Sequence, residues 1–141
     1  MNSGKEIIKG LFIGSFVCAE DDDWLIENNI KGVLTVCEDK PVLLGIDMYL
    51  YLPTSDWGPM NFDYFEKCFD FIDNSIKVGN VMVHCFAGIN RSASVIIAYI
   101  MYKSDCSYEE AYERVKTMSP LIDPTSSLIS EIKSYFKYLN E

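Results

Sequence analysis

The sequence predicts an α/β domain, a three-layer α/β/α sandwich around a mainly parallel sheet of four to five strands. Short apolar runs rich in β-branched residues alternate along the chain with longer segments whose apolar residues recur at helical spacing. One of these runs, Val81 to Val83, contains no polar residue, which is typical of a strand buried on both faces of a parallel sheet. With 141 residues the chain has the size of a single domain, which we expect to span residues 1–141.

Four segments are predicted to be strands, with a short helix between the first two. The predicted strands are Leu11 to Ile13, Gly32 to Cys37, Asp47 to Leu52 and Val81 to Val83. The short helix is expected from about Glu20 to Asn28, because the aspartates at 21–23 lie where a helix N-terminus favours negative charge.

Residues 61–79 are predicted to form a long amphipathic helix that ends near Gly79. Its buried face carries aromatic and aliphatic residues at steps of 3, 4, 3 and 4, namely Phe62, Phe65, Phe69, Ile72 and Ile76. The segment from Ser92 to Lys103 is apolar on nearly every side, which places the next helix in the middle of the protein.

Two further helices are predicted toward the C-terminus. Ser107 and Glu110 have the spacing of a capping box, so a helix is expected to open there and to continue to about Met118. Asp123-Pro124 is expected to open the last helix. The buried side of this last helix carries Leu128, Ile132, Tyr135 and Leu139.

The N-terminal segment resembles a signal peptide loosely, since Lys5 and Lys9 precede a mostly apolar stretch at 10–19. Gly14-Ser15 interrupts this stretch, and cleavage after it would remove the first predicted strand, so we expect no leader. No run of about 18 apolar residues exists, and we expect no membrane-spanning segment.

Charge and cysteine content restrict the expected partners. The chain has 12 Lys and Arg against 21 Asp and Glu, a net charge of −9. A field of this sign repels phosphate, so we expect neither nucleic acid nor an anionic membrane as a partner. The five cysteines are dispersed and form no Cys-x-x-Cys pair, which favours reduced thiols over disulfides or a metal site. We therefore expect a monomer without metal or cofactor, located in the cytoplasm or nucleus.

The segment from Val83 to Ser92 (Val-His-Cys-Phe-Ala-Gly-Ile-Asn-Arg-Ser) joins the buried strand to the central helix. Successive backbone N–H groups in a loop at a helix N-terminus converge on one point and bind an oxyanion such as phosphate. Gly88 can adopt the positive φ that such a tight curl needs, and Arg91 can donate two N–H groups to two oxygens. This predicts a phosphate-binding strand-loop-helix whose loop is Phe86, Ala87, Gly88, Ile89, Asn90 and Arg91.

Cys85 lies at the base of this predicted loop. Thiols near a helix N-terminus and an arginine ionise more readily than free thiols, so we expect Cys85 to be a nucleophile. His84 is the only histidine, and adjacent side chains on a strand point to opposite faces. We therefore expect His84 to hydrogen-bond the loop backbone and hold its shape, rather than to act as a base for Cys85.

His84 to Ser92 matches, at every fixed position, the signature His-Cys-x-x-Gly-x-x-Arg-Ser/Thr of the cysteine-based protein phosphatases. Within that superfamily the chain resembles the small dual-specificity phosphatases most, also in Leu11 to Ser15, Tyr51 to Asp56 and Arg91 to Ser94. The resemblance implies that the substrates are phosphotyrosine and phosphoserine/phosphothreonine proteins. It also implies hydrolysis of their phosphate monoesters through a phosphocysteine intermediate.

The resemblance assigns roles to two further residues. Asp56 matches the general acid of the family, and a carboxyl on a loop can protonate a leaving oxygen; Asp63 is the alternative carboxylate. Ser92 matches a hydroxyl that stabilises the thiolate as it leaves the phosphocysteine. Gly58 and Pro59 suggest that the loop bearing Asp56 closes as a lid.

The sequence is also compatible with other functions. A pseudophosphatase adaptor would bind phosphate without turnover, although such modules typically lack the nucleophile. Lipid phosphatases of the superfamily usually carry lysines inside the loop, which this loop lacks. Asn90 matches the residue found in RNA 5′-triphosphatases of the superfamily, but those enzymes have a second histidine where this chain has Ala87. A redox role is also open, in which Cys37 or Cys106 forms a disulfide with Cys85.

Overall fold

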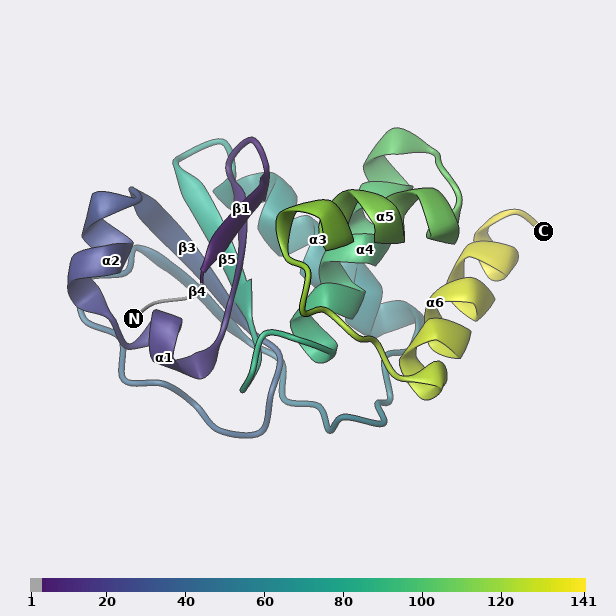
Figure 1. The fold of residues 1–141 in the computed structure, drawn as a ribbon, viewed down its shortest axis with the longest axis horizontal. Coiled ribbons are helices and arrows are strands. Elements are labelled where there is room, and N and C mark those ends of the chain that lie inside the picture. The colour runs from purple at the N-terminus through teal and green to yellow at the C-terminus, as the bar shows by residue number, and fades with distance from the viewer. Residues whose placement is uncertain (1–3) are drawn as a thin grey trace.

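The computed structural model describes residues 4–141 and arranges them as a five-stranded sheet with six helices (Figure 1). The elements are β1 Lys5–Ile8, β2 Leu11–Gly14, α1 Phe16–Ala19, α2 Asp22–Glu27, β3 Ile30–Thr35, β4 Met48–Tyr51, α3 Phe62–Ser75, β5 Asn80–His84, α4 Arg91–Ser104, α5 Tyr108–Met118 and α6 Ser126–Leu139. The strand order is β1-β2-β5-β3-β4, in which β1 is antiparallel to β2 and the other neighbours are parallel.

Helices cover both faces of the sheet, so the predicted three-layer α/β/α sandwich is confirmed. The short helices α1 and α2 lie on one face, and α3 to α6 lie on the other (Figure 1). The central strand β5 supplies side chains to both cores, because neighbouring side chains of a strand point to opposite faces. Met82 packs in the smaller core beneath α1 and α2, whereas Val81 and Val83 pack in the larger one.

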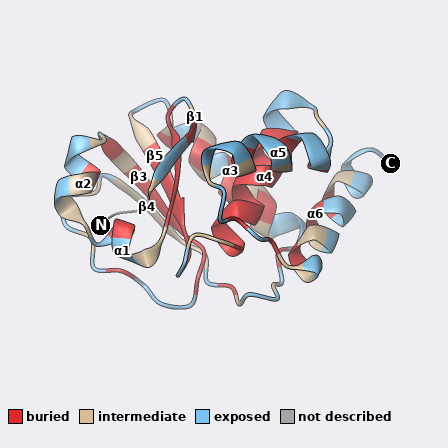
Figure 2. Ribbon diagram, in the orientation of Figure 1, coloured by how far each residue is buried: buried red, intermediate tan, exposed pale blue. Residues whose placement is uncertain are grey.

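Helix α4 is the central helix, as its apolar sequence predicts. Every residue from Arg91 to Met101 is buried, and α4 contacts α3, α5, α6 and the sheet (Figure 2). The burial fixes the first turn of α4 at the carboxyl end of β5. The phosphate-binding loop predicted from the sequence lies between these two elements.

The N-terminal segment differs from the expectation. Lys5 belongs to an edge strand, β1, which pairs antiparallel with β2 through the register Lys5↔Ile13. The sequence analysis missed β1 because an edge strand of four residues with two exposed side chains has little apolar pattern. No helix within the described part of the chain is long and apolar enough to cross a membrane.

Several predicted element boundaries are wrong by a few residues. Helix α2 begins at Asp22, with the Asp21 side chain accepting from Trp24 N, and a separate short helix, α1, precedes it. Helix α3 ends at Ser75 rather than near Gly79. Helix α6 begins at Ser126 rather than at Asp123-Pro124, because the Thr125 hydroxyl accepts from Leu128 N and caps it.

Two residues predicted to be buried lie at helix ends and are partly exposed. Phe62 in the first turn of α3 is 40% exposed, and Leu139 in the last turn of α6 is 41% exposed. Phe62 still contacts the rings of Tyr135 and Tyr138 on α6, so its partial exposure reflects its place in the first turn of α3. The other predicted positions of α6, including Ile132 and Tyr135, are buried.

Candidate active site

The loop between β5 and α4 packs against the end of β2. Gly88 has a φ of +75°, and a Cβ atom there would lie 3.0 Å from the carbonyl oxygen of Gly14. Phe16 N donates to the Phe86 carbonyl oxygen at 2.9 Å, which ties the loop to α1. Glycine at 88 therefore allows both the curl of the loop and its close approach to β2.

Cys85 and Ser92 face each other at the base of this loop. Cys85 is 2% exposed, and its Sγ lies 3.2 Å from Oγ of Ser92 in the first turn of α4. Cys85 borders a cavity of about 320 Å³. The residues that line this cavity are Asp56, Trp57, Cys85, Phe86, Ala87, Ile89, Asn90, Arg91 and Thr125. The structure thus brings together Cys85, Arg91 and Asp56, the residues predicted from the sequence to be the nucleophile, the phosphate-binding arginine and the general acid.

Arg91 is held by groups from two other loops. Its Nη1 donates to the Thr54 carbonyl oxygen at 2.8 Å and to Oε1 of Glu38, and its Nε lies 3.2 Å from Oδ1 of Asp56. Burial by itself lowers the pKa of Arg91, but the hydrogen bond to Glu38 and the negative charges of Cys85 and Asp56 outweigh it. The pKa of Arg91 is therefore raised, and its guanidinium stays charged.

Glu38 is a site residue that the sequence analysis missed. It follows β3 and is brought to Arg91 because the carboxyl ends of parallel strands meet at one edge of a sheet. A hydrogen bond from its own backbone N–H and another from Arg91 lower the pKa of the Glu38 carboxyl. The position of Glu38 could have indicated its role. Glu38 follows a predicted strand just as Asp56 follows the neighbouring parallel strand β4, so both are expected at the same edge of the sheet.

Asp56 lies in a turn after β4, and its side chain is 59% exposed. The loop around it, which was predicted to close as a lid, is bonded within itself and to α6. Ser55 Oγ donates to the Gly58 carbonyl oxygen at 2.8 Å, and Met60 N donates to Oε2 of Glu131 on α6 at 2.8 Å. The alternative carboxylate, Asp63, is exposed in the first turn of α3 and is not among the described residues that line the cavity of Cys85.

His84 is fully buried, and both of its ring nitrogens have partners. Nδ1 lies 3.0 Å from the Cys85 carbonyl oxygen, and Nε2 lies 2.7 Å from Oγ1 of Thr35. Because a carbonyl oxygen only accepts, the proton belongs on Nδ1 and Nε2 accepts from Thr35, whose hydroxyl in turn accepts from Tyr49 at 2.8 Å. Burial lowers the pKa of His84 to about 4, so the ring is neutral near pH 7.

Cys85 forms no disulfide with another cysteine in the described part of the chain. Cys37 is buried after β3, where desolvation raises the pKa of its thiol to about 11, and its Sγ lies 3.4 Å from the Asp39 carbonyl oxygen. Within residues 4–141, no three His, Cys, Asp or Glu side chains are grouped closely enough to hold a metal ion.

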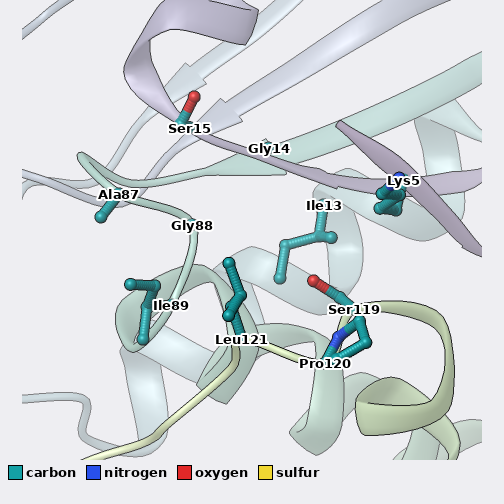
Figure 3. A pocket seen from close by; sticks show the side chains of 10 residues that line it. All are labelled: Lys5, Ile13, Gly14, Ser15, Ala87, Gly88, Ile89, Ser119, Pro120 and Leu121. Carbon is teal, nitrogen blue, oxygen red and sulfur yellow. The ribbon is translucent and has the colours of Figure 1, made fainter. Parts of the chain in front are cut away.

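A second cavity of about 120 Å³ lies beside the loop, where residues of the loop, of β2 and of the segment Ser119 to Leu121 line it (Figure 3). Figure 3 shows Ala87, Gly88 and Ile89 on one side of it and the segment Ser119 to Leu121 facing them. Ala87 and Ile89 line both cavities. The lining of this second cavity includes no thiol and no carboxylate, whereas the cavity of Cys85 is lined by Cys85 and Asp56.

A buried thiol at the base of a loop of backbone amides, with an arginine beside it, defines the cysteine-based phosphatase class. Comparison with known proteins narrows the class. The family described as "Dual specificity phosphatase, catalytic domain" matches residues 11–138. Dual specificity protein phosphatase 1B of Arabidopsis thaliana is 35% identical over 135 residues, which are 94% of this chain and 81% of that protein. The chain therefore belongs to the dual-specificity phosphatase family.

Other relatives are longer than this chain. MAP kinase phosphatase with leucine-rich repeats protein 1 of Dictyostelium discoideum is 34% identical over 136 residues, 96% of this chain but 16% of that protein. Among solved structures, human tyrosine phosphatase-like serine/threonine/tyrosine-interacting protein shares the fold with a TM-score of 0.90 and 28% identity. That match covers 98% of each chain. This chain thus spans less than a fifth of the Dictyostelium protein and nearly the whole of the human structure.

Proposed function

We propose that this domain hydrolyses the phosphate monoesters of phosphorylated proteins, on tyrosine and on serine or threonine, through a phosphocysteine intermediate. The observation that carries the proposal is that Cys85, Arg91 and Asp56 line one cavity, with Ser92 Oγ 3.2 Å from the Cys85 sulfur. Membership of the dual-specificity phosphatase family supports the same reaction.

In the first step, the Cys85 thiolate attacks phosphorus in line with the leaving oxygen. The sulfur–phosphorus bond forms as the phosphorus–oxygen bond to the protein side chain breaks. The loop amides and Arg91 hold the equatorial oxygens, where negative charge is concentrated. Asp56 gives its proton to the departing oxygen, so the substrate leaves as a neutral alcohol or phenol.

In the second step, water attacks the phosphocysteine. Asp56, now ionised, takes a proton from that water, and the phosphorus–sulfur bond breaks to release inorganic phosphate. The Ser92 hydroxyl donates to the departing thiolate. His84 keeps the loop in shape through its hydrogen bond to the Cys85 carbonyl oxygen.

A phosphate-binding adaptor without turnover is the second candidate, favoured by the similarity to the human tyrosine phosphatase-like interacting protein. The three groups that line the cavity, Cys85, Arg91 and Asp56, support an enzyme instead, because an adaptor needs no nucleophile and no proton donor. We further propose a monomer in the cytoplasm or nucleus that acts on phosphorylated proteins and on neither nucleic acid nor membranes. The dispersed cysteines, which form no Cys-x-x-Cys pair, support a reducing compartment.

Turnover of a nitrophenyl phosphate distinguishes the two candidates. The wild-type chain should hydrolyse it, and Cys85→Ser should abolish the reaction while still binding phosphopeptides. Phosphopeptide binding by the wild type without any turnover would favour the adaptor. If the wild type does turn over the aryl phosphate, the proteins that immobilised Cys85→Ser retains from a lysate would identify the substrates.

A further inference from the structure

We propose that Asn90 is a positioning residue that holds the general acid Asp56 in the orientation needed for proton transfer. This inference rests on the proposed function, because it assumes that Asp56 is the acid. It assigns to Asn90, which the sequence analysis treated only as a member of the phosphate-binding loop, a role in the proton-transfer half of the reaction.

The Asn90 side chain joins three segments at the cavity. Its Nδ2 donates to the Asp56 carbonyl oxygen at 2.9 Å and lies 3.3 Å from the carboxylate oxygen Oδ1 of Asp56. Its Oδ1 accepts from the backbone N–H of Thr125, just before α6, at 2.8 Å. Asn90 is only 9% exposed, so its own amide is largely shielded from water.

The conformation of Asn90 shows that this amide does not cap its own helix. Asn90 occupies the N-cap position of α4, where an asparagine side chain typically accepts from a backbone N–H of the first turn. No such bond is present at Asn90. The amide is turned toward Asp56 and Thr125 instead, at the expense of a helix cap.

These contacts determine the orientation of the Asp56 carboxylate, and so which of its oxygens faces the leaving group. Oδ1 of Asp56 accepts from Nδ2 of Asn90 at 3.3 Å and lies 3.2 Å from Nε of Arg91, an ion-pair contact without hydrogen-bond geometry. The Asn90 amide and the Arg91 guanidinium both lie on the Oδ1 side of the carboxylate, which leaves Oδ2 as the oxygen that faces the leaving group in this proposal. Since the Asp56 side chain is 59% exposed, packing alone does not fix its rotation. Asn90 anchors both the backbone and the side chain of the acid.

A double-mutant cycle tests the proposal, with Asn90→Ser introduced into the wild type and into Asp56→Ala. Each variant is assayed with a phosphothreonine peptide and with nitrophenyl phosphate, whose phenol leaves without much help from an acid. Asn90→Ser should lower kcat on the peptide by about 10-fold or more, and by much less on the aryl ester. In the Asp56→Ala background, Asn90→Ser should cause almost no further loss on the peptide.

Ser127→Ala is the matched control. Ser127 Oγ donates to the carbonyl oxygen of Trp57 at 2.5 Å, in the same loop and one residue from Asp56, but it does not contact the acid. This variant should show no difference between the two substrates. The comparison separates a general loosening of the loop from the specific loss of the Asn90 contact.

Two results would overturn the proposal. One is an equal loss on both substrates in Asn90→Ser, and the other is an undiminished loss in the Asp56→Ala background; either would mean that Asn90 serves only the phosphate-binding loop. A different result would show that Asp56 is not the general acid. In that case Asp56→Ala itself would affect the two substrates equally, which would reject Asp56 as the acid whatever Asn90 does.

Discussion

Arg91 Nη1 donates to the Thr54 carbonyl oxygen at 2.8 Å, so the arginine of the phosphate-binding loop is bonded directly to the loop that carries Asp56. Thr54 is two residues from Asp56, and Glu38 from a third loop accepts from the same nitrogen. The guanidinium is therefore oriented before any substrate arrives. An arginine so restrained loses less conformational entropy when it binds phosphate.

The first prediction concerns this planar group. Arg91→Lys should lower kcat on nitrophenyl phosphate by about 10²–10³-fold, nearly as much as Arg91→Ala, because one ammonium group cannot hold two transition-state oxygens. A lysine at this position would also lose the planar group that donates to both the Thr54 carbonyl oxygen and Glu38. Steady-state kinetics on folded protein, checked by circular dichroism, measures the effect. A lysine variant with most of the wild-type kcat would contradict the assigned role.

The second prediction concerns His84 and pH. The pKa of His84 is lowered to about 4, whereas an unfolded chain has a histidine pKa of about 6.5. Between these values the unfolded state binds a proton that the folded state does not, so stability falls as pH falls. The free energy of unfolding should decrease by about 1.5 kcal/mol between about pH 6.5 and pH 5.

Urea unfolding at the two pH values measures this decrease. Since His84 is the only histidine, the His84→Gln variant should be less stable overall but should lose most of the pH dependence in this range. A variant with the same pH dependence as the wild type would show that other groups cause it. The aryl phosphatase activity of the variant should also fall, because the loop loses its bond at the Cys85 carbonyl oxygen.

The third prediction concerns metals and anions. The proposed reaction uses a thiolate and an arginine where metallophosphatases use metal ions, so activity should survive an excess of EDTA. Vanadate should inhibit competitively, because its oxygens fit the same loop of amides. Loss of activity in EDTA that zinc or magnesium restores would contradict the mechanism. Arg91→Ala should weaken the inhibition by vanadate.

The parts of this fold that could be predicted from the sequence are those set by local pattern. The loop from Cys85 to Arg91 is marked by fixed spacing, and α4 by an uninterrupted apolar surface, so both were predicted at nearly their observed positions. β1 was missed because an edge strand needs only its pairing with β2, which leaves little pattern in four residues.

The contacts that complete the site could not be predicted in the same way. Asn90 bonds to Asp56 and Thr125, which lie 34 and 35 residues away in the sequence, and Glu38 bonds to Arg91 across 53 residues. No periodicity encodes such pairs, since they depend on the order of the strands in the sheet. The family resemblance located Asp56, but it did not indicate which residues orient it.

The last prediction tests Asp56 through the leaving group that it serves. A general acid matters in proportion to the negative charge on the departing oxygen, so its removal should affect alkyl phosphates much more than activated aryl phosphates. Asp56→Ala should lose about 10²–10⁴-fold in kcat on phosphoserine or phosphothreonine peptides, and less on nitrophenyl phosphate. The basic limb of the kcat/KM profile should flatten, because it reports the protonated acid. Asp63→Ala, which removes a carboxylate of α3 outside the cavity, should change neither result. A uniform loss across leaving groups would mean that Asp56 only shapes its loop, and a large effect at Asp63 would identify that residue as the acid.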